Sequence, residues 1–311
     1  MQPPHPKIWL SFDQQLELLK TRGLHISDDA KATEYLARIG YYRLSGYFYA
    51  MRERNGNIIG DHFKSGAGFQ DAVLLYIFDK KLRLLVLDAL ERIEIALRVD
   101  VSHHLGRLDK FAYRNPDLLH HSFSKTTSDQ HSRHTDWLNK HEQLIKRSKE
   151  EFILHNKVKY GLPLPIWVAC EVWDFGCLST LFGGMKENDQ DAVAQKYGIR
   201  NGRIFASWLR SLNYLRNICA HHSRLWNRNI TVQPKLPPAS DTAWVGIFGE
   251  KHKARCFLLL YLCRHLLKVI NPQSSWPQRM KQHLSDFPDL THLGLNLKGM
   301  GVPDDWENHW A

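Results

Sequence analysis

The longest periodic segment of the chain, residues 69–105, is the feature that most constrains its fold. Apolar side chains recur along this segment in steps of three and four residues, at Leu75, Phe78, Leu82, Leu85, Ala89, Ile93 and Leu97. The opposite face carries Lys80, Lys81, Asp88, Glu91 and Arg92. This spacing predicts a long amphipathic helix, unbroken or interrupted once, that ends near Gly106.

Most of the remaining chain also has the pattern of helices, and strand signals are almost absent. Further helices are expected over residues 12–22, 28–39, 136–159, 162–184, 187–197, the first part of 201–228, 251–270 and 277–287. Residues 55–68, 106–134 and 229–250 lack this periodicity and are interpreted as loops. Asn55 and Gly56 could turn a short hairpin, but no sheet is expected for it to join. The predicted fold class is therefore all-α, with roughly 60% helix.

Three regions follow from this pattern, and together they are expected to form one compact unit. Residues 1–68 form an N-terminal helical region with an aromatic and basic segment. Residues 69–235 form the helical core, and residues 236–311 form C-terminal helices and a surface tail. Trp306 and Trp310 are the expected anchors of that tail.

The charge balance indicates an anionic partner. Lys and Arg number 42 against 32 Asp and Glu, which gives a formal net charge of +10 with histidines neutral. Nucleic acid is the commonest partner of such a protein. A basic surface that only keeps the protein soluble is the alternative, and charge alone does not decide between the two.

The cysteines and the apolar runs predict a soluble, cytoplasmic protein. The five cysteines lie in apolar, helix-like surroundings without CxxC spacing, at positions 170, 177, 219, 256 and 263. They are interpreted as reduced, buried thiols, and no zinc site is expected. The chain start lacks an apolar signal segment, and no apolar run approaches the ~20 residues that span a membrane. No membrane partner is therefore expected.

The candidate catalytic residues are Arg216, Asn217 and His221, near the end of an amphipathic helix within residues 201–228. A neutral histidine can take the proton of a ribose 2′-OH or protonate the leaving 5′-oxygen. Arginine can stabilise charge on the phosphorus, and asparagine can orient the histidine or hold a phosphate oxygen. These residues suit metal-independent cleavage of RNA to a 2′,3′-cyclic phosphate, with no cofactor.

Helical geometry separates the two main candidates. Because each residue of an α-helix turns about 100°, Arg216 and His221 lie roughly 140° apart, whereas Asn217 and His221 share a face. A complete site is therefore expected where two such helices meet, which favours a homodimer. Taken alone, the spacing R-N-x-x-x-H fits equally well a helix-end histidine beside a solvated arginine.

Other polar residues are weaker candidates. His222 competes with His221 as the catalytic histidine, and Glu171 stands on a predicted, nearly all-apolar helix. A buried carboxylate needs a partner, and the arginines of residues 201–228 are the expected ones. Glu94 and Arg98 are interpreted as ordinary helix support, or alternatively as an ion pair behind the groove. The candidates for RNA binding are Arg203, Arg210, Arg224 and Arg228.

Several segments are similar, in order and spacing, to those of a known family. They are LSFDQQLELLKTRGL, YLARIGYYRLSGYFY, LYIFDKKLRLLVLDALERIEIALR, LPIWVACEVWDFGCLSTLF and LRNICAHHSRLWNR, within residues 10–230. They resemble the AbiD/AbiF-type abortive-infection proteins, which carry a HEPN-like ribonuclease motif. The C-terminal third resembles that family less distinctly.

This resemblance implies a HEPN-like helical bundle with additional N- and C-terminal helices, usually dimeric. It also implies a metal-independent endoribonuclease site at the dimer groove and a role in bacterial phage defence. Arg216 and His221 match the catalytic pair of the family, and Asn217 matches the polar residue beside the arginine. A toxic ribonuclease would need a neutralising partner, such as an inhibitory small RNA or an antitoxin.

Two other functions remain open from the sequence. The protein could be a non-catalytic RNA-binding module that holds a small structured RNA. It could also be a nucleotidyl- or AMP-transferase partner, but the sequence lacks a Gly-rich phosphate loop and the paired aspartates of such enzymes.

Overall fold

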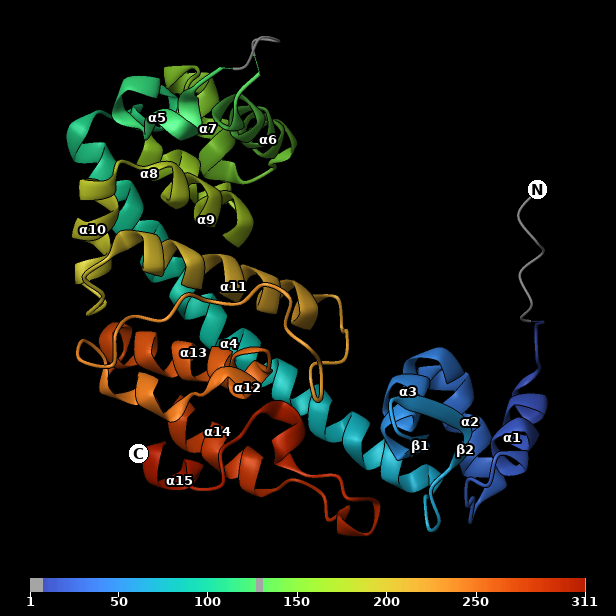
Figure 1. Cartoon of the computed structure of the whole chain (residues 1–311). Helices are drawn as coiled ribbons and strands as arrows, with labels where there is room; N and C mark the ends of the chain where they lie inside the picture. Colours follow the sequence, from blue (N-terminus) through green and yellow to red (C-terminus); the bar gives the residue numbers. More distant parts are fainter. Residues whose placement is uncertain (1–7, 127–130, 311) are drawn as a thin grey trace. The chain divides into compact units, whose positions relative to one another are not determined.

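The fold is predominantly α-helical, as the sequence predicts, and 66% of the described residues are helical. The structure is a computed structural model that describes residues 8–126 and 131–310 (Figure 1). These residues divide into two compact units. The first comprises residues 8–83 and 280–299, and the second comprises the described residues of 84–279 and 300–310.

Three short helices and a hairpin form most of the first unit. The helices are α1 (Phe12–Thr21), α2 (Asp29–Ile39) and α3 (Tyr41–Phe48), and the strands are β1 (Arg52–Asn55) and β2 (Ile58–Phe63). A capping box at Ser11 and Gln14 fixes the start of α1. The side chain of Asp28 caps α2 by accepting a hydrogen bond from the N–H of Lys31.

The hairpin corrects the interpretation of residues 55–68 as a loop. Strands β1 and β2 pair antiparallel, with Asn55 opposite Ile58 and Arg52 opposite Phe63. Within the described residues, these two strands pair only with each other. Many of their side chains are exposed and polar, so the sequence has no alternation of apolar and polar residues that would predict strands. The only signal in the sequence was the pair Asn55 and Gly56, which is typical of a hairpin turn. In the structure Gly56 has a left-handed backbone, with φ of 59°.

Helix α4 (Phe69–Leu108) is continuous over 40 residues. Six of the seven predicted apolar positions are at most 4% exposed, namely Leu75, Phe78, Leu82, Ala89, Ile93 and Leu97. The prediction of a long helix from the apolar spacing is therefore confirmed, without the interruption that was left open. Its residues up to Arg83 belong to the first unit, and those from Leu84 belong to the second.

The second unit is a packed set of helices around α11 (Gly202–Ala220). Helix α11 packs against α9 (Phe175–Gly184), α10 (Glu187–Gln195) and α13 (Cys256–Ile270) (Figure 1). Asn201 starts α11 by accepting hydrogen bonds from the N–H groups of Arg203 and Ile204. The remaining helices are α5 (His121–Ser124), α6 (Arg133–Arg147), α7 (Glu151–Tyr160), α8 (Ile166–Ala169), α12 (Glu250–Lys253), α14 (Trp276–Ser285) and α15 (Trp306–His309).

Residues 162–184 do not form the single helix that their apolar run predicts. They form α8, a 3₁₀ turn over Cys170–Val172, and α9. The break falls at Trp173 and Asp174, whose backbones are extended. Asp174 then caps α9 by accepting a hydrogen bond from the N–H of Cys177, 2.6 Å away. Residues 162–184 are nearly all apolar, so their sequence has no polar–apolar pattern whose interruption would mark this break.

The thiols and the tail agree with the sequence analysis. All five cysteines are free and buried. Trp306 and Trp310 are 6% and 2% exposed, and the ring of Trp310 lies 5.6 Å from that of Phe257 in α13. The searched residues, 8–126 and 131–310, contain no helix that is long and apolar enough to cross a membrane.

A buried ion pair stabilises the first unit. Asp79 and Arg83 of α4 are 0% and 4% exposed and bind each other. The hydroxyl of Tyr47 in α3 also donates to Asp79, at 2.6 Å. Burial and the charge of Asp79 raise the pKa of this hydroxyl, so Tyr47 stays a donor.

Replacing Arg83 is therefore expected to destabilise the protein strongly. The substitution Arg83→Met removes the guanidinium that binds the buried Asp79 carboxylate, which costs about 3–5 kcal/mol. Lys20→Met is a suitable control, because Lys20 pairs with the more exposed Glu17 and Asp29 and its loss costs about 1 kcal/mol or less. Thermal unfolding followed by circular dichroism measures both. Equal small losses would contradict the expectation.

Candidate functional site

The predicted motif lies at the C-terminal end of α11. His221 is the exposed C-cap residue, and His222 has a left-handed backbone with φ of 55°. The N–H of His222 donates to the carbonyl of Cys219 at 3.0 Å, and that of Ser223 donates to Ile218 at 2.9 Å. This pair of bonds is the Schellman motif, in which glycine usually takes the left-handed position. The turn therefore ends the helix sharply and leaves the His221 imidazole in solvent.

Arg216 lies earlier on α11 and faces α4. It is half-buried and lines a pocket of about 470 Å³. The other lining residues all come from α4, and they are Leu87, Asp88, Leu90, Glu91, Glu94, Ile95 and Arg98. The guanidinium of Arg216 also donates to Oδ1 of Asn217 at 3.4 Å. The candidate arginine thus stands in a charged pocket rather than free in solvent.

Arg98 organises the wall of this pocket. Its guanidinium donates to Oε1 of Glu94 at 2.9 Å, to the carbonyl of Trp173 at 3.0 Å, and to Oε2 of Glu171 at 3.3 Å. The side chains of Arg98 and Glu94 are only 15% and 17% exposed, so water screens this pair weakly. These bonds join α4 to the segment that leads into α9.

The positive charge of Arg216 acts to lower the pKa of two nearby carboxylates, Glu94 and Asp174. Burial raises the pKa of Glu94 above its ordinary value, although Arg98 and Arg216 oppose the rise. Burial also acts to raise the pKa of Asp174, but a hydrogen bond from Lys140 and one from the Cys177 N–H outweigh it, and the charge of Arg216 adds to this lowering. The Lys140 ammonium lies 2.8 Å from Asp174. Arg216 is therefore near one carboxylate with a raised pKa and one with a lowered pKa.

The expectation for Glu171 was wrong in two respects. Its side chain is 47% exposed on the 3₁₀ turn, rather than buried in a helix. Its ion-pair partner is Arg98 of α4, not an arginine of residues 201–228. Glu171 lies on the 3₁₀ turn within reach of α4, where Arg98 donates to its carboxylate at 3.3 Å.

The two main candidates do not meet within one chain. Among residues 8–126 and 131–310, no hydrogen bond or ion pair joins Arg216 to His221. The His221 side chain likewise has no hydrogen-bond partner in that part of the chain. Arg216 faces α4, whereas His221 stands at the exposed end of α11. A single chain therefore presents the arginine and the histidine in two separate directions.

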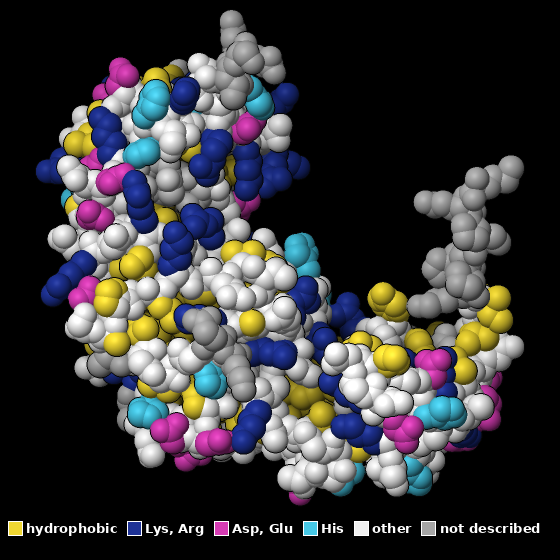
Figure 2. All heavy atoms as spheres, viewed as in Figure 1, with side chains coloured by type: hydrophobic (Ala, Val, Ile, Leu, Met, Phe, Trp, Pro, Cys, Tyr) yellow, Lys and Arg dark blue, Asp and Glu magenta, His cyan; other side chains and the backbone are white. Residues whose placement is uncertain are grey.

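The predicted RNA-binding arginines are dispersed. Arg203 pairs with Glu187 of α10 at the first turn of α11, about 27 Å of helix from His221. Arg210 is exposed on α11, and Arg228 donates to the carbonyl of Arg224 beyond the helix end, at 3.4 Å. Many of the Lys and Arg side chains visible in Figure 2 lie over α6 and α7 instead.

Sequence reasoning placed Glu94 and Arg98 correctly as an i,i+4 pair but could not locate them beside Arg216. It also missed Lys140, because no local pattern links residue 140 to residue 174. Among the described residues, no group of three or more His, Cys, Asp or Glu side chains could hold a metal ion.

The left-handed backbone of His222 makes a prediction about stability. Removing the side chain in His222→Gly suits this conformation, so the free energy of unfolding should change by about 1 kcal/mol or less. His222→Val places a β-branched residue there and should cost about 1–2 kcal/mol more than glycine.

Chemical denaturation of both variants measures this difference, with His155→Val on the exposed face of α7 as the control. That control should change stability by about 0.5 kcal/mol. A valine variant as stable as the glycine variant would show that the backbone of residue 222 is not strained.

Comparison with known proteins identifies a family. A family model described as Abi-like protein matches residues 34–227, which is more than half of the chain. The matched range includes α4 from its first residue, the turn that carries Glu171, and the motif from Arg216 to His222. No curated protein and no solved structure matches the chain.

Proposed function

The chain belongs to the Abi-like protein family, and from this premise we propose that it is an abortive-infection protein that acts as a metal-independent endoribonuclease. One observation carries the proposal. Arg216 is half-buried in a pocket lined by charged groups of α4, while His221 at the end of the same helix keeps both ring nitrogens available. A cation and an available imidazole are the two groups that this cleavage requires.

Each residue has a definite role in the proposed reaction. His221 takes the proton of the ribose 2′-OH, whose oxygen then attacks the adjacent phosphorus, or it protonates the departing 5′-oxygen. Arg216 stabilises the charge that accumulates on the phosphate oxygens. Asn217, which shares a face with His221, holds a phosphate oxygen or orients the imidazole. The products are a 2′,3′-cyclic phosphate and a 5′-OH, and DNA is excluded because it lacks the nucleophile.

The surroundings of Arg216 support this role. Glu94, Arg98 and Asp174 are themselves fixed by hydrogen bonds to other elements. A guanidinium near such fixed charges is oriented before the substrate arrives, so little reorganisation is needed during the reaction. Arg98 acts here as a positioning residue, because its contacts are with Glu94, Glu171 and Trp173.

A second copy of the chain would complete the site. The arginine and the histidine point in different directions, so substrate that reaches both needs groups from elsewhere. At the arginine pocket, α4 exposes the apolar side chains of Ile95, which lines the pocket, and Val99, and they are 50% and 57% accessible. We place the two-fold axis of a homodimer at this face of α4, which would bring two motifs to one groove.

Non-catalytic binding of a small structured RNA is the alternative. The absence of any bond between Arg216 and His221 in the described chain favours it, because phosphate binding needs no concerted pair. In either case we propose RNA as the partner and the cytoplasm as the location. A nuclease of this kind would be held silent by an inhibitory RNA or an antitoxin in healthy cells.

Substitution of the two main residues tests the catalytic proposal. His221→Ala should reduce RNA cleavage about 10²–10⁴-fold, and Arg216→Ala about 10²–10³-fold, because each removes a group that acts in the transition state. His155→Ala and Arg200→Ala are matched controls on exposed positions, and they should cleave like the wild type. Cleavage of a labelled RNA by the purified proteins measures the rates.

The outcome separates the two functions. If His221→Ala still binds RNA and no longer cleaves it, the catalytic role stands. If wild type and both variants cleave at the same rate, the assignment of the site is wrong. If wild type binds RNA and never cleaves it, the binding module is the correct function.

A charge on the exposed face of α4 tests the homodimer. Val99→Asp should shift the protein from dimer to monomer in light scattering and reduce cleavage in parallel, because an aspartate cannot be buried there without a partner. Val158→Asp on α7 is the control, since Val158 is 90% exposed away from the pocket. A Val99→Asp variant that keeps both its oligomeric state and its activity would contradict this interface.

A further inference from the structure

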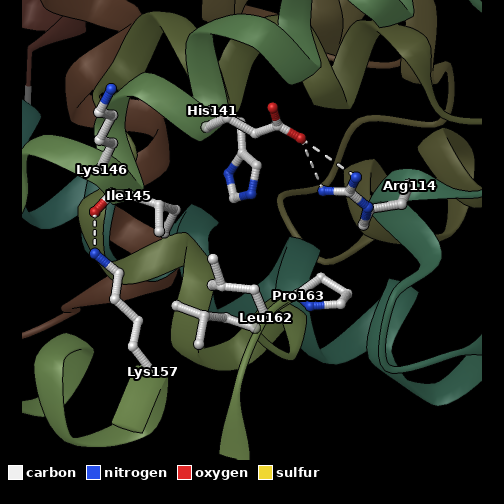
Figure 3. A pocket seen from close by; sticks show the side chains of 9 residues that line it. Arg114, His141, Ile145, Lys146, Lys157, Leu162 and Pro163 are labelled. Carbon is white, nitrogen blue, oxygen red and sulfur yellow. Dashed lines mark hydrogen bonds and ion pairs between the residues drawn. The ribbon is translucent and has the colours of Figure 1, made fainter.

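A second pocket, of about 590 Å³, lies between α6, α7 and the segment before α8 (Figure 3). Its lining residues are Arg114, His141, Glu142, Ile145, Lys146, Lys157, Leu162, Pro163 and Leu164. None of them lines the pocket of Arg216. Its volume falls within the range of small-molecule sites, and apolar walls with a few polar groups are typical of such sites.

His141, a mostly buried residue, supplies a donor to this pocket. The residue is 2% exposed, and its ring projects toward Leu162 and Pro163 in Figure 3. The indole N–H of Trp173 donates to Nδ1 of His141 at 2.9 Å, so the proton of the neutral ring is on Nε2. Burial, with a smaller effect of Arg114, lowers the pKa of His141 to about 4, which keeps the ring neutral.

The Nε2–H of His141 has no hydrogen-bond partner within the described chain. Trp137 stacks parallel to the ring with centroids 5.5 Å apart, and Tyr113 packs against it in a T-shaped contact at 4.8 Å. His141 lines the pocket, so an acceptor on a bound molecule can receive this N–H.

The charges of the pocket favour an anion. The lining contains three cations, Arg114, Lys146 and Lys157, and one carboxylate, Glu142, so its net charge is +2. Arg114 is paired with Glu142 at 3.2 Å, and the Lys157 ammonium donates to the carbonyl of Ile145 at 2.7 Å. Lys146 makes no ion pair or hydrogen bond within residues 8–126 and 131–310. A phosphate monoester carries about −1.5 to −2 at neutral pH and would match this balance.

The pocket is also connected to the Arg216 site. Trp173 donates through its indole to His141, and its carbonyl accepts from Arg98 at 3.0 Å. Arg98 in turn binds Glu94 in the wall of the arginine pocket. A single buried residue therefore contacts the donor of one pocket and the positioning arginine of the other.

We propose that this pocket binds a small phosphate monoester with a flat ring, of the nucleoside monophosphate class, and that its occupancy changes the activity of the Arg216 site through Trp173. The phosphate lies near Lys146 and Lys157, the ring lies against Ile145, Leu162 and Pro163, and a ring acceptor receives the Nε2–H of His141. The coupling rests on the proposed ribonuclease function, whereas the binding does not.

Binding is measured with AMP as the probe, by calorimetry and by thermal unfolding. At ten times its dissociation constant, AMP should raise the Tm of the wild type by about 3–5 °C. Adenosine and inorganic phosphate, which each lack one half of the ligand, should bind at least about tenfold more weakly. Lys146→Glu should weaken AMP at least about tenfold, and the exposed control Lys159→Glu should leave it unchanged. Absence of AMP binding, or equal binding by Lys146→Glu, overturns the proposal.

The coupling is measured in the RNA cleavage assay. AMP should change the cleavage rate of the wild type about fivefold or more, and should have no effect on Lys146→Glu. Trp173→Phe keeps most of the ring but loses the indole N–H, so it should bind AMP and lose the effect on cleavage. If AMP binds and leaves the wild-type rate unchanged, the coupling is wrong. If the wild type cleaves no RNA, the proposed function fails while the binding result still stands.

Discussion

The geometry of the candidate site depends on one guanidinium, that of Arg98. It binds a carboxylate on its own helix, a second carboxylate on the turn before α9, and the backbone carbonyl of Trp173. Removing it would leave Glu94, at 17% side-chain exposure, without its closest cation. Because Glu94 lines the same pocket as Arg216, this link between α4 and the segment before α9 fixes one wall of the pocket in which the candidate catalytic arginine lies.

The helices that could be predicted from the sequence are those in which apolar residues recur every three or four positions. The spacing of apolar residues in α4 and the amphipathic pattern of α11 were sufficient to place both helices, and the five cysteines are buried thiols as expected. The hairpin of β1 and β2 was not predicted, because its side chains are mostly exposed and carry no alternation. The break at Trp173 was also hidden, because a continuous apolar run looks the same with and without it.

The site itself was predictable only as a list of residue types. Helical geometry correctly separated Arg216 from His221, and the structure shows why, since one faces α4 and the other ends α11. The contribution of Glu94, Lys140 and Asp174 comes from contacts between distant segments, which no local spacing reports. At His222 the chain departs from local preference, because a residue with a side chain takes a position that glycine usually occupies. Such departures are concentrated at functional sites.

The chemistry of RNA ends tests the central claim most directly. Sequencing of RNA after incubation with wild type and with His221→Ala distinguishes cleavage by 2′-OH attack from other routes. The account predicts 2′,3′-cyclic phosphate and 5′-OH ends with the wild type, and background levels of both with His221→Ala. Equal numbers of such ends with the two proteins, or tight RNA binding by the wild type without any such ends, would contradict it.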